Sequence, residues 1–344
     1  MADVVKNYSI HDIISFKIID KNNFFKKKFS RFETSYSYFQ VNKLSNPDII
    51  INIGPFQPSN NNCKVLDGRF HIKKDYLFCN DSYKLAKWKL EIIGLESKKT
   101  IINVDANASG QLFIPGYIID PIIRIKMQEK GYPMIHASAV SKNKNGYVFA
   151  ARSGCGKTVI SVSLLEKGFD FLGDNWIIIK NGYALNYIST LNIFDYNIND
   201  FVSDKMSSKD LYILKLKKIL YDMTDGYIKL FSQIQIHRFI SKINKRTKIS
   251  KLFFITKNKK FSIKNKINKD NLITQLVLNN KFEMFPFFKY MLEYSFIFPN
   301  SKIASFLPDM EENIRRSLKN VKLYRMFIPE NITPKTFKKI RESL

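Results

Sequence analysis

The stretch from Ala151 to Thr158 reads Ala-Arg-Ser-Gly-Cys-Gly-Lys-Thr and decides how the rest of the chain is interpreted. It fits the Walker A form, which is Gly or Ala, four residues, and then Gly-Lys-Ser/Thr. Glycines let the backbone wrap around a phosphate, and the next helix points its positive N-terminus at the same anion. Lys157 is expected to reach the β- and γ-phosphates, and the Thr158 hydroxyl to bind Mg²⁺. The sequence therefore predicts an ATP and Mg²⁺ site lined by Ala151, Arg152, Ser153, Gly154, Cys155, Gly156, Lys157 and Thr158.

The residues around this loop predict a strand before it and a helix after it. Tyr147–Ala150 is apolar, and Lys157–Lys167 has helical periodicity that stops at Gly168. A strand at Tyr132–Val140 is separated from Tyr147 by only six residues. Such a link suits an antiparallel hairpin and is too short for a parallel crossover. In standard P-loop NTPases the preceding strand is reached through a crossover, so the hairpin favours a different type.

Further helices and strands are predicted before and after this segment of the chain. Asp120-Pro121 opens a helix that runs to Gly131. After the loop we expect a strand at Phe169–Leu172 followed by Asp174, and a hairpin around Asn181-Gly182. Helices at Lys209–Tyr221 and over 271–320, and strands at Lys251–Thr256 and Val321–Ile328, complete the pattern.

The N-terminal third differs from the rest in being rich in strand-forming residues. The predicted strands there are Ile13–Ile19, Ser35–Val41, Asp48–Ile53 and Trp88–Ile93. The sequence therefore predicts an α/β protein with a β-rich N-terminal region, 1–100, and a P-loop domain, 101–344. Whether the first region binds a substrate or completes the fold is left open.

The run from His136 to Trp176 resembles the HPr serine kinase/phosphorylase family, within the phosphoenolpyruvate-carboxykinase-like group. The resemblance lies in four segments and their spacing: His-Ala-Ser-Ala-Val at 136–140, Arg-Ser-Gly-Cys-Gly-Lys-Thr at 152–158, Leu-Leu-Glu-Lys-Gly at 164–168, and the Asp-Asn step at 174–175. The pattern of helices and strands on either side agrees loosely. The resemblance implies a P-loop kinase core, with a mixed sheet and a hairpin before the phosphate loop.

The resemblance also implies roles for single residues. Asp174 is implied as the general base that takes a proton from an acceptor hydroxyl, a role that suits a carboxylate beside the γ-phosphate. His136 is implied to face the same pocket and, with Lys157, to complete the catalytic set. Each has a plainer reading: His136 as a core histidine, and Asp174 as a turn residue.

One position departs from the family pattern. The family has Asp-Asp after the strand, whereas this chain has Asn175. An Asn carbonyl can still bind a metal, so Thr158 and Asn175 are the predicted metal ligands, but the lost charge puts the metal geometry and any phosphorylase activity in doubt. Asp195 and Asp200 are the nearest candidates for a further acidic ligand, and Arg238 for a phosphate clamp; all three also read as plain loop or surface residues.

The chain's formal net charge of +26 has two readings. One is an acidic partner such as nucleic acid or anionic lipid. The other, which we favour, is a composition rich in Lys, Asn and Ile, of the kind an AT-rich genome produces, because the lysines are spread along the whole chain. We therefore expect no specific nucleic-acid partner.

The cysteines and apolar runs bear on location. Cys63, Cys79 and Cys155 form no CxxC pair or zinc-ligand spacing, which suits a reducing cytoplasm. The start of the chain has no apolar core of signal-peptide length, and we expect no membrane span.

These observations predict an ATP- and Mg²⁺-dependent kinase that phosphorylates a hydroxyl of a protein, a peptide or a small molecule, with Ser as the expected acceptor. Two other classes stay open at this point: a regulatory nucleotide-binding module without transfer activity, and a nucleic-acid-associated P-loop ATPase. Homo-oligomer formation is expected only because relatives of the family often assemble.

Overall fold

The computed structural model describes residues 3–22, 35–189, 191–194, 207–223, 231–234, 240, 242–330 and 332–344. Two compact units divide the chain. The first consists of Met1–Pro133 and Asn280–Asn313, and the second of Met134–Asn279 and Ile314–Leu344. Each unit contains its own large mixed sheet, so the protein belongs to the α/β class.

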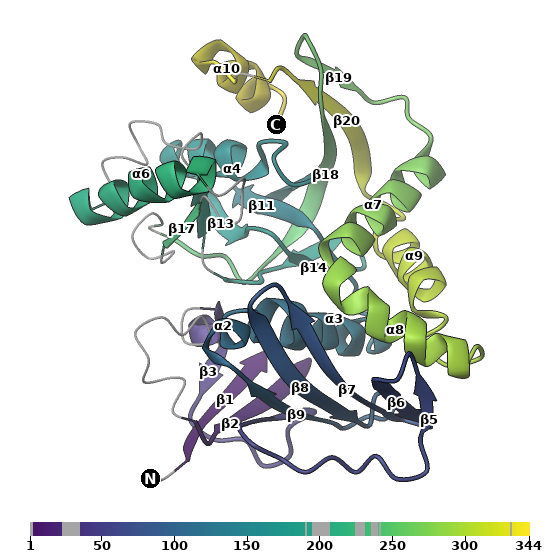
Figure 1. Cartoon of the computed structure of the whole chain (residues 1–344). Coiled ribbons are helices and arrows are strands. Elements are labelled where there is room, and N and C mark those ends of the chain that lie inside the picture. The colour runs from purple at the N-terminus through teal and green to yellow at the C-terminus, as the bar shows by residue number, and fades with distance from the viewer. Residues whose placement is uncertain are drawn as a thin grey trace. The chain divides into compact units, whose positions relative to one another are not determined.

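The first unit is built on a nine-stranded sheet of order β3-β1-β2-β4-β9-β8-β7-β6-β5 (Figure 1). The pairs β2–β4 and β4–β9 are parallel and the other pairs are antiparallel. β2 shows the expected two-residue alternation, in which every second side chain is buried. The strands are β1 (Val4–Ile10), β2 (Ile14–Asp20), β3 (Gln40–Val41), β4 (Ile49–Ile53), β5 (Lys64–Leu66), β6 (Phe70–Lys73), β7 (Tyr76–Tyr83), β8 (Ala86–Ile93) and β9 (Thr100–Ala106).

Helices pack against this sheet. In α3, every residue from Pro121 to Gln128 is buried, including two charged ones, Arg124 and Lys126. Lys126 donates from Nζ to the carbonyl oxygens of Leu95, at 2.9 Å, and Ser97, at 2.8 Å. Burial of that ammonium group lowers its pKa, and Glu129 opposes the shift. The helical elements are η2 (Ser37–Phe39), α2 (Ala108–Gln111), η3 (Pro115–Ile119), α3 (Asp120–Glu129), α8 (Phe285–Ile297) and the first part of α9 (Phe306–Ser317).

The second unit has a nine-stranded sheet in which β10-β14-β15-β18-β12-β11-β13 are neighbours, and β20 pairs with both β18 and β19. β12 lies between β11, to which it is antiparallel, and β18, to which it is parallel. The strands are β10 (Met134–Ile135), β11 (Ala137–Lys142), β12 (Asn145–Ala150), β13 (Asp170–Gly173), β14 (Ile177–Lys180), β15 (Tyr183–Leu185), β18 (Arg246–Lys257), β19 (Ser262–Lys264) and β20 (Lys322–Ile328). A separate ribbon joins β16 (Leu191–Phe194) and β17 (Phe231–Ile234).

A buried apolar cluster joins this sheet to its helices. Phe149 of β12 stacks on Phe253 of β18, with ring centroids 5.6 Å apart, and Ile160 and Leu164 come from the helix that follows the phosphate loop. The helices of this unit are α4 (Lys157–Glu166), α6 (Ser208–Met223), most of α7 (Lys269–Glu283) and α10 (Pro334–Glu342). In the described part of the chain, no helix combines the length and apolarity needed to cross a membrane.

Most predicted elements are confirmed, including the hairpin before the phosphate loop. β11 and β12 pair antiparallel up to Lys142 and Asn145, with a two-residue turn in which Asn143 and Lys144 have positive φ. The predicted strand at Ser35–Val41 was wrong over residues 35–39, and only Gln40–Val41 forms a strand, β3. Tyr36 and Phe39 are buried in a helical turn there, and Tyr36 meets the ring of Phe16 edge-on, with centroids 5.2 Å apart.

The compact units also divide the chain differently from the predicted regions 1–100 and 101–344. β9 begins at Thr100 and pairs with β4 and β8, so the first sheet continues past residue 100. The first unit then extends through α3 to Pro133 and takes up the segment Asn280–Asn313.

Candidate functional site

The predicted phosphate loop connects the end of β12 to the start of α4. Gly154 and Gly156 have φ of +81° and +88°, in the left-handed region that favours glycine. A Cβ at Gly156 would also lie 2.9 Å from Ile332 Cδ1, whereas one at Gly154 would meet nothing within 4 Å. The Cys155 amide donates to Arg152 O at 3.2 Å, which closes a turn within the loop. The backbone therefore turns sharply and enters α4 with the open N-terminal amides that bind anions in other proteins.

Lys157 is the first residue of α4, and its side chain folds back over the loop. It is only 6% exposed, and Nζ donates to the carbonyl oxygens of Ala151, at 2.9 Å, and Arg152, at 3.3 Å. The ammonium group is thus hydrogen-bonded to the backbone of the same loop with which it is predicted to bind phosphate. A phosphate would offer it charged acceptors in place of these carbonyls.

Asp174 directly follows β13 and contacts the other side of the loop. Its Oδ2 accepts a hydrogen bond from Thr158 Oγ1 at 2.9 Å. The side chain is 2% exposed, and among the described residues its buried Oδ1 has no hydrogen-bond partner. Burial raises the pKa of this carboxyl, while the charge of Lys157, the Thr158 hydroxyl and the Asn175 amide act against the shift. Strand and helix termini thus bring together Lys157, Thr158 and Asp174, three residues that the sequence singles out.

The turn after Asp174 is tight. A Cβ at Gly173 would lie 2.7 Å from Ile177 Cδ1 and 3.0 Å from Tyr187 O, so a larger residue does not fit without movement. Asn175 has φ of +74°, a left-handed conformation that Asn tolerates better than most residues. Its carbonyl accepts from the Ala137 amide at 3.2 Å, which ties the turn to β11. Asn175 is half-buried, and its role as a metal ligand stays a prediction.

His136 lies between β10 and β11 and is 3% exposed. Its ring packs against that of Trp176, with centroids 5.5 Å apart. Its carbonyl oxygen accepts from Asn279 Nδ2 at 3.2 Å, and the same amide group donates to Ala151 O at 3.0 Å. The structure therefore links His136 to the first residue of the phosphate loop through Asn279. The catalytic role of the His136 ring stays a prediction.

The sequence did not reveal Asn279. It is 2% exposed and belongs to α7, far along the chain from the loop. Two serines were also missed: Ser161 Oγ donates to Ser138 Oγ at 2.7 Å, and Ser138 Oγ donates to Lys157 O at 3.2 Å. This buried pair fastens the first turns of α4 to β11. The apolar periodicity of a helix does not indicate such contacts. The only hint in the sequence is weak: each serine stands in an otherwise apolar segment.

One of the two predicted metal ligands, Thr158, contacts a carboxylate. Thr158 Oγ1 and Asp174 Oδ2 are the adjacent pair, and hydroxyl and carboxylate oxygens suit Mg²⁺. Among the described residues, no group of three or more His, Cys, Asp or Glu side chains could hold a metal ion. The predicted candidates Asp195, Asp200 and Arg238 lie outside the described residues.

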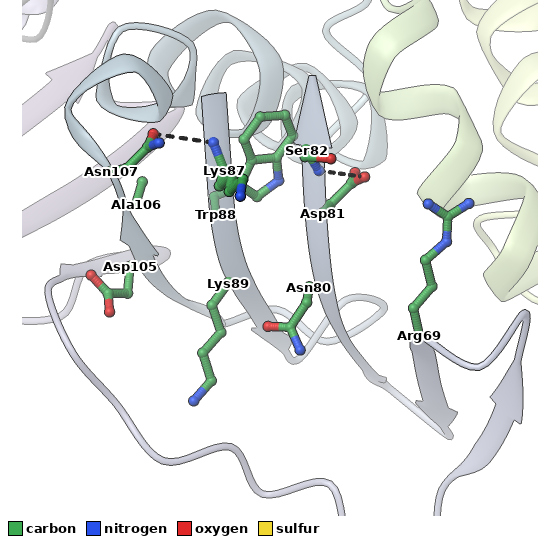
Figure 2. Close-up of a pocket in the computed structure, with 10 residues that line it drawn as sticks. All are labelled: Arg69, Asn80, Asp81, Ser82, Lys87, Trp88, Lys89, Asp105, Ala106 and Asn107. Atoms are coloured by element: carbon green, nitrogen blue, oxygen red, sulfur yellow. Dashed lines mark hydrogen bonds between the residues drawn. The ribbon is translucent and has the colours of Figure 1, made fainter. Parts of the chain in front are cut away.

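A hollow lies on the sheet of the first unit and contains none of the predicted site residues. It has a volume of about 600 Å³ and is lined by residues of β7, β8 and β9 together with Arg69 and Asn107. Figure 2 shows Asn80, Lys89 and Asp105 on three adjacent strands, where they are direct cross-strand neighbours. Two backbone amides on its edge already donate hydrogen bonds to side chains of the protein: Lys87 N donates to Asn107 Oδ1 at 3.1 Å, and Ser82 N to Asp81 Oδ1 at 2.8 Å. The hollow is open and polar, unlike the enclosed, mostly apolar pockets that bind small molecules.

Comparison with known proteins adds little to this geometry. No family model matches the chain, and no match was found among curated proteins. Among solved structures, the Hpr(Ser) kinase/phosphatase from Coxiella burnetii is similar over 46% of this chain and 95% of its own. The identity is 13% and the TM-score is 0.23. A similarity at this level carries no conclusion about the site.

Proposed function

We propose that this protein is an ATP- and Mg²⁺-dependent kinase of the HPr-kinase-like type, which transfers the γ-phosphate to a hydroxyl group. The observation that carries the proposal is the hydrogen bond between Thr158 Oγ1 and Asp174 Oδ2. It joins a buried carboxylate to the first turn of the helix that follows a phosphate loop. The candidate proton acceptor and the candidate phosphate-binding groups thus belong to one small region, as phosphoryl transfer requires.

The residues present fit a nucleoside triphosphate with Mg²⁺. The left-handed glycines shape the loop, a Cβ-sized space is open at Gly154, and Asp174 Oδ1 is a buried oxygen without a described partner. Loop amides and Lys157 would hold the phosphates, and the Thr158 hydroxyl with the Asn175 side chain would offer oxygens to the metal. When bound, ATP and Mg²⁺ would supply the transferable phosphoryl group and the divalent charge that stabilises it.

Asp174 would take the proton of the acceptor. One carboxylate oxygen, Oδ2, holds the Thr158 hydroxyl, which leaves Oδ1 to accept a hydrogen bond from the incoming hydroxyl. Because burial raises the pKa of this carboxyl, it is a stronger base than an exposed aspartate. Lys157 would move from its loop carbonyls to the phosphate oxygens and offset the negative charge near Asp174. The acceptor would be a Ser of a protein or peptide, or a small alcohol.

A second candidate function is a nucleotide-binding module without transfer activity. The observation that favours it is the neutral Asn175 beside a single buried carboxylate, an arrangement with less negative charge for a metal than two aspartates would supply. In that case the loop would bind ATP as a signal, and the Asp174 contact with Thr158 would be structural.

A transfer assay separates the two. The full chain is incubated with Mg²⁺, γ-labelled ATP, and either free serine or a mixture of serine-containing peptides, and both ADP and labelled acceptor are measured. We expect transfer by the wild type and a loss of about 10²-fold or more in Asp174→Asn, with ATP affinity retained. Asp170→Asn, at the first residue of β13, is the control and should keep the wild-type rate. Tight ATP binding with neither ADP nor labelled acceptor formed would reject the kinase and favour the second candidate.

A further inference from the structure

The segment that begins at the end of β18 is strongly basic. Between Lys257 and Lys269 nearly half of the residues are lysine and none is acidic, whereas lysine and arginine together make up 56 of the 344 residues of the chain. We call residues 257–269 the lysine segment. Five of its six lysines are exposed and form no ion pair with a described acidic side chain, namely Lys259, Lys260, Lys264, Lys266 and Lys269.

The lysine segment begins at the sheet edge that carries the phosphate loop. β12 and β18 are parallel, and Ala150, the last residue of β12, is the neighbour of Phe254. Lys257 ends β18 and is the neighbour of Ile328, the last residue of β20. A Cβ at Gly156 would lie 3.4 Å from Ile328 Cδ1. The carboxyl ends of these three parallel strands therefore bring the start of the lysine segment beside the loop, at the edge where ligands bind to open α/β sheets.

Packing holds the lysine segment on the same core as the phosphate loop. Its half-buried apolar residues, Phe261 and Ile263, pack against the apolar cluster that contains Ala151, and Cys155 packs against that cluster too. β19 lies within the segment and pairs antiparallel with β20 (Figure 1). The segment therefore presents its exposed lysines from a fixed position in the second unit.

The chemistry of the lysine segment favours an acidic peptide as its partner. Among the described residues β19 pairs only with β20, which leaves its other edge open to an extended chain. Lysines along such an edge disfavour neutral or basic strands and so select an acidic one. A single-stranded nucleic acid would also need aromatic rings on which its bases stack. Phe261, the only aromatic residue of the segment, is instead packed against the core.

We propose that the lysine segment binds the acceptor of the kinase, and that this acceptor is a polypeptide with several Asp or Glu residues around the hydroxyl that is phosphorylated. The inference rests on the proposed function and narrows its acceptor from any hydroxyl to an acidic polypeptide. In the transfer, the acceptor oxygen forms a bond to the γ-phosphorus, the bond from that phosphorus to the β–γ bridging oxygen breaks, ADP leaves, and Asp174 takes the proton.

Binding of an acidic peptide to the full chain, without nucleotide, tests the proposal. The probe is the labelled peptide Glu-Glu-Glu-Ser-Glu-Glu-Glu, followed by fluorescence anisotropy at about 150 mM salt, where distant charges are screened. We expect the wild type to bind it about 10-fold or more tightly than the same peptide with Gln for Glu, because several ammonium–carboxylate pairs act together.

Two double variants with the same net charge show whether the position of the lysines matters. Lys259→Glu/Lys260→Glu should weaken binding of the acidic peptide about 10-fold or more, because attraction becomes repulsion at the lysine segment. The matched control is Lys245→Glu/Lys248→Glu, in which the two lysines are equally exposed but lie at the amino end of β18, away from the phosphate loop. It should bind the peptide like the wild type.

Three results would overturn the proposal. An equal loss of affinity in both double variants would mean that only the net charge attracts the peptide. Tighter binding of a labelled oligothymidylate, lost in Lys259→Glu/Lys260→Glu, would assign the segment to nucleic acid. A smaller stabilisation by ATP in that variant alone would assign the lysines to the nucleotide.

The same measurements separate this proposal from the proposed function. Phosphate transfer to free serine by a chain that does not bind the acidic peptide would reject the docking surface and leave the kinase standing. Peptide binding that depends on Lys259 and Lys260, with no transfer to the peptide serine, would support the acidic partner and reject the kinase.

Discussion

At the scale of single residues, Asp174 has two opposite requirements. It must lose its proton to act as a base, yet it is 2% exposed, and burial disfavours the charged form. The charge of Lys157, the Thr158 hydroxyl and the Asn175 amide only partly offset this cost, because the pKa stays raised. Such a conflict between stability and charge is common at active sites.

The conflict predicts how stability depends on pH. A carboxyl whose pKa is higher in the folded than in the unfolded chain adds stability at low pH, and this is lost as the pH rises through the folded-state pKa. At pH 7, Asp174→Asn should therefore be more stable than the wild type by on the order of 1 kcal/mol and unfold at a higher temperature, because the amide oxygen can still accept from Thr158 and carries no charge.

Thermal unfolding of both chains across the acid-to-neutral range measures this difference. It should shrink toward low pH as Asp174 becomes protonated. Asp170→Asn, at the start of the strand that precedes Asp174, should show no comparable trend. A stability difference that stays constant with pH would contradict the raised pKa. So would an Asp174→Asn chain that is less stable than the wild type at pH 7 but equally stable at low pH.

At the scale of secondary-structure elements, α4 is held to β11 by the Ser138–Ser161 hydroxyl pair. Removing one hydroxyl leaves its buried partner with one contact fewer, so Ser138→Ala or Ser161→Ala should each cost about 1–3 kcal/mol of unfolding free energy. The double variant should cost less than the two single costs combined, because both belong to one contact.

Urea denaturation of the wild type, the two single variants and the double variant gives the coupling free energy between the two hydroxyl groups. Ser163→Ala, at a half-buried position of the same helix, is the control and should stay within about 0.5 kcal/mol of the wild type. Strictly additive costs for Ser138 and Ser161 would show that the hydroxyl pair does not hold α4 in place.

Much of the element pattern around the site could be predicted. A six-residue link between two apolar runs indicated the hairpin, and glycine-rich residues between a strand and a helix indicated the loop. Other features depended on contacts between distant residues. Ser35–Val41 has the composition of a strand, but burial of Tyr36 and Phe39 favours a helical turn. Asn279 looks like one polar residue in a helix until the fold places it against Ala151 O. Local pattern also does not say which sheet the helices after residue 280 pack against.

At the scale of the whole molecule, two units each have their own sheet and core. The predicted ATP site lies entirely within the second unit, on β12, α4 and β13.

The central claim is that the phosphate loop binds ATP with Mg²⁺, and the most direct test is thermal stabilisation of the full chain by that ligand. At about a hundred times its dissociation constant, ATP with Mg²⁺ should add about 2.7 kcal/mol of stability to the wild type. Lys157→Ala should abolish this shift, whereas Lys167→Ala, an exposed lysine after the same helix, should keep it. A folded wild type that gains no stability from ATP and Mg²⁺, or a Lys157→Ala chain that gains as much, would contradict the account.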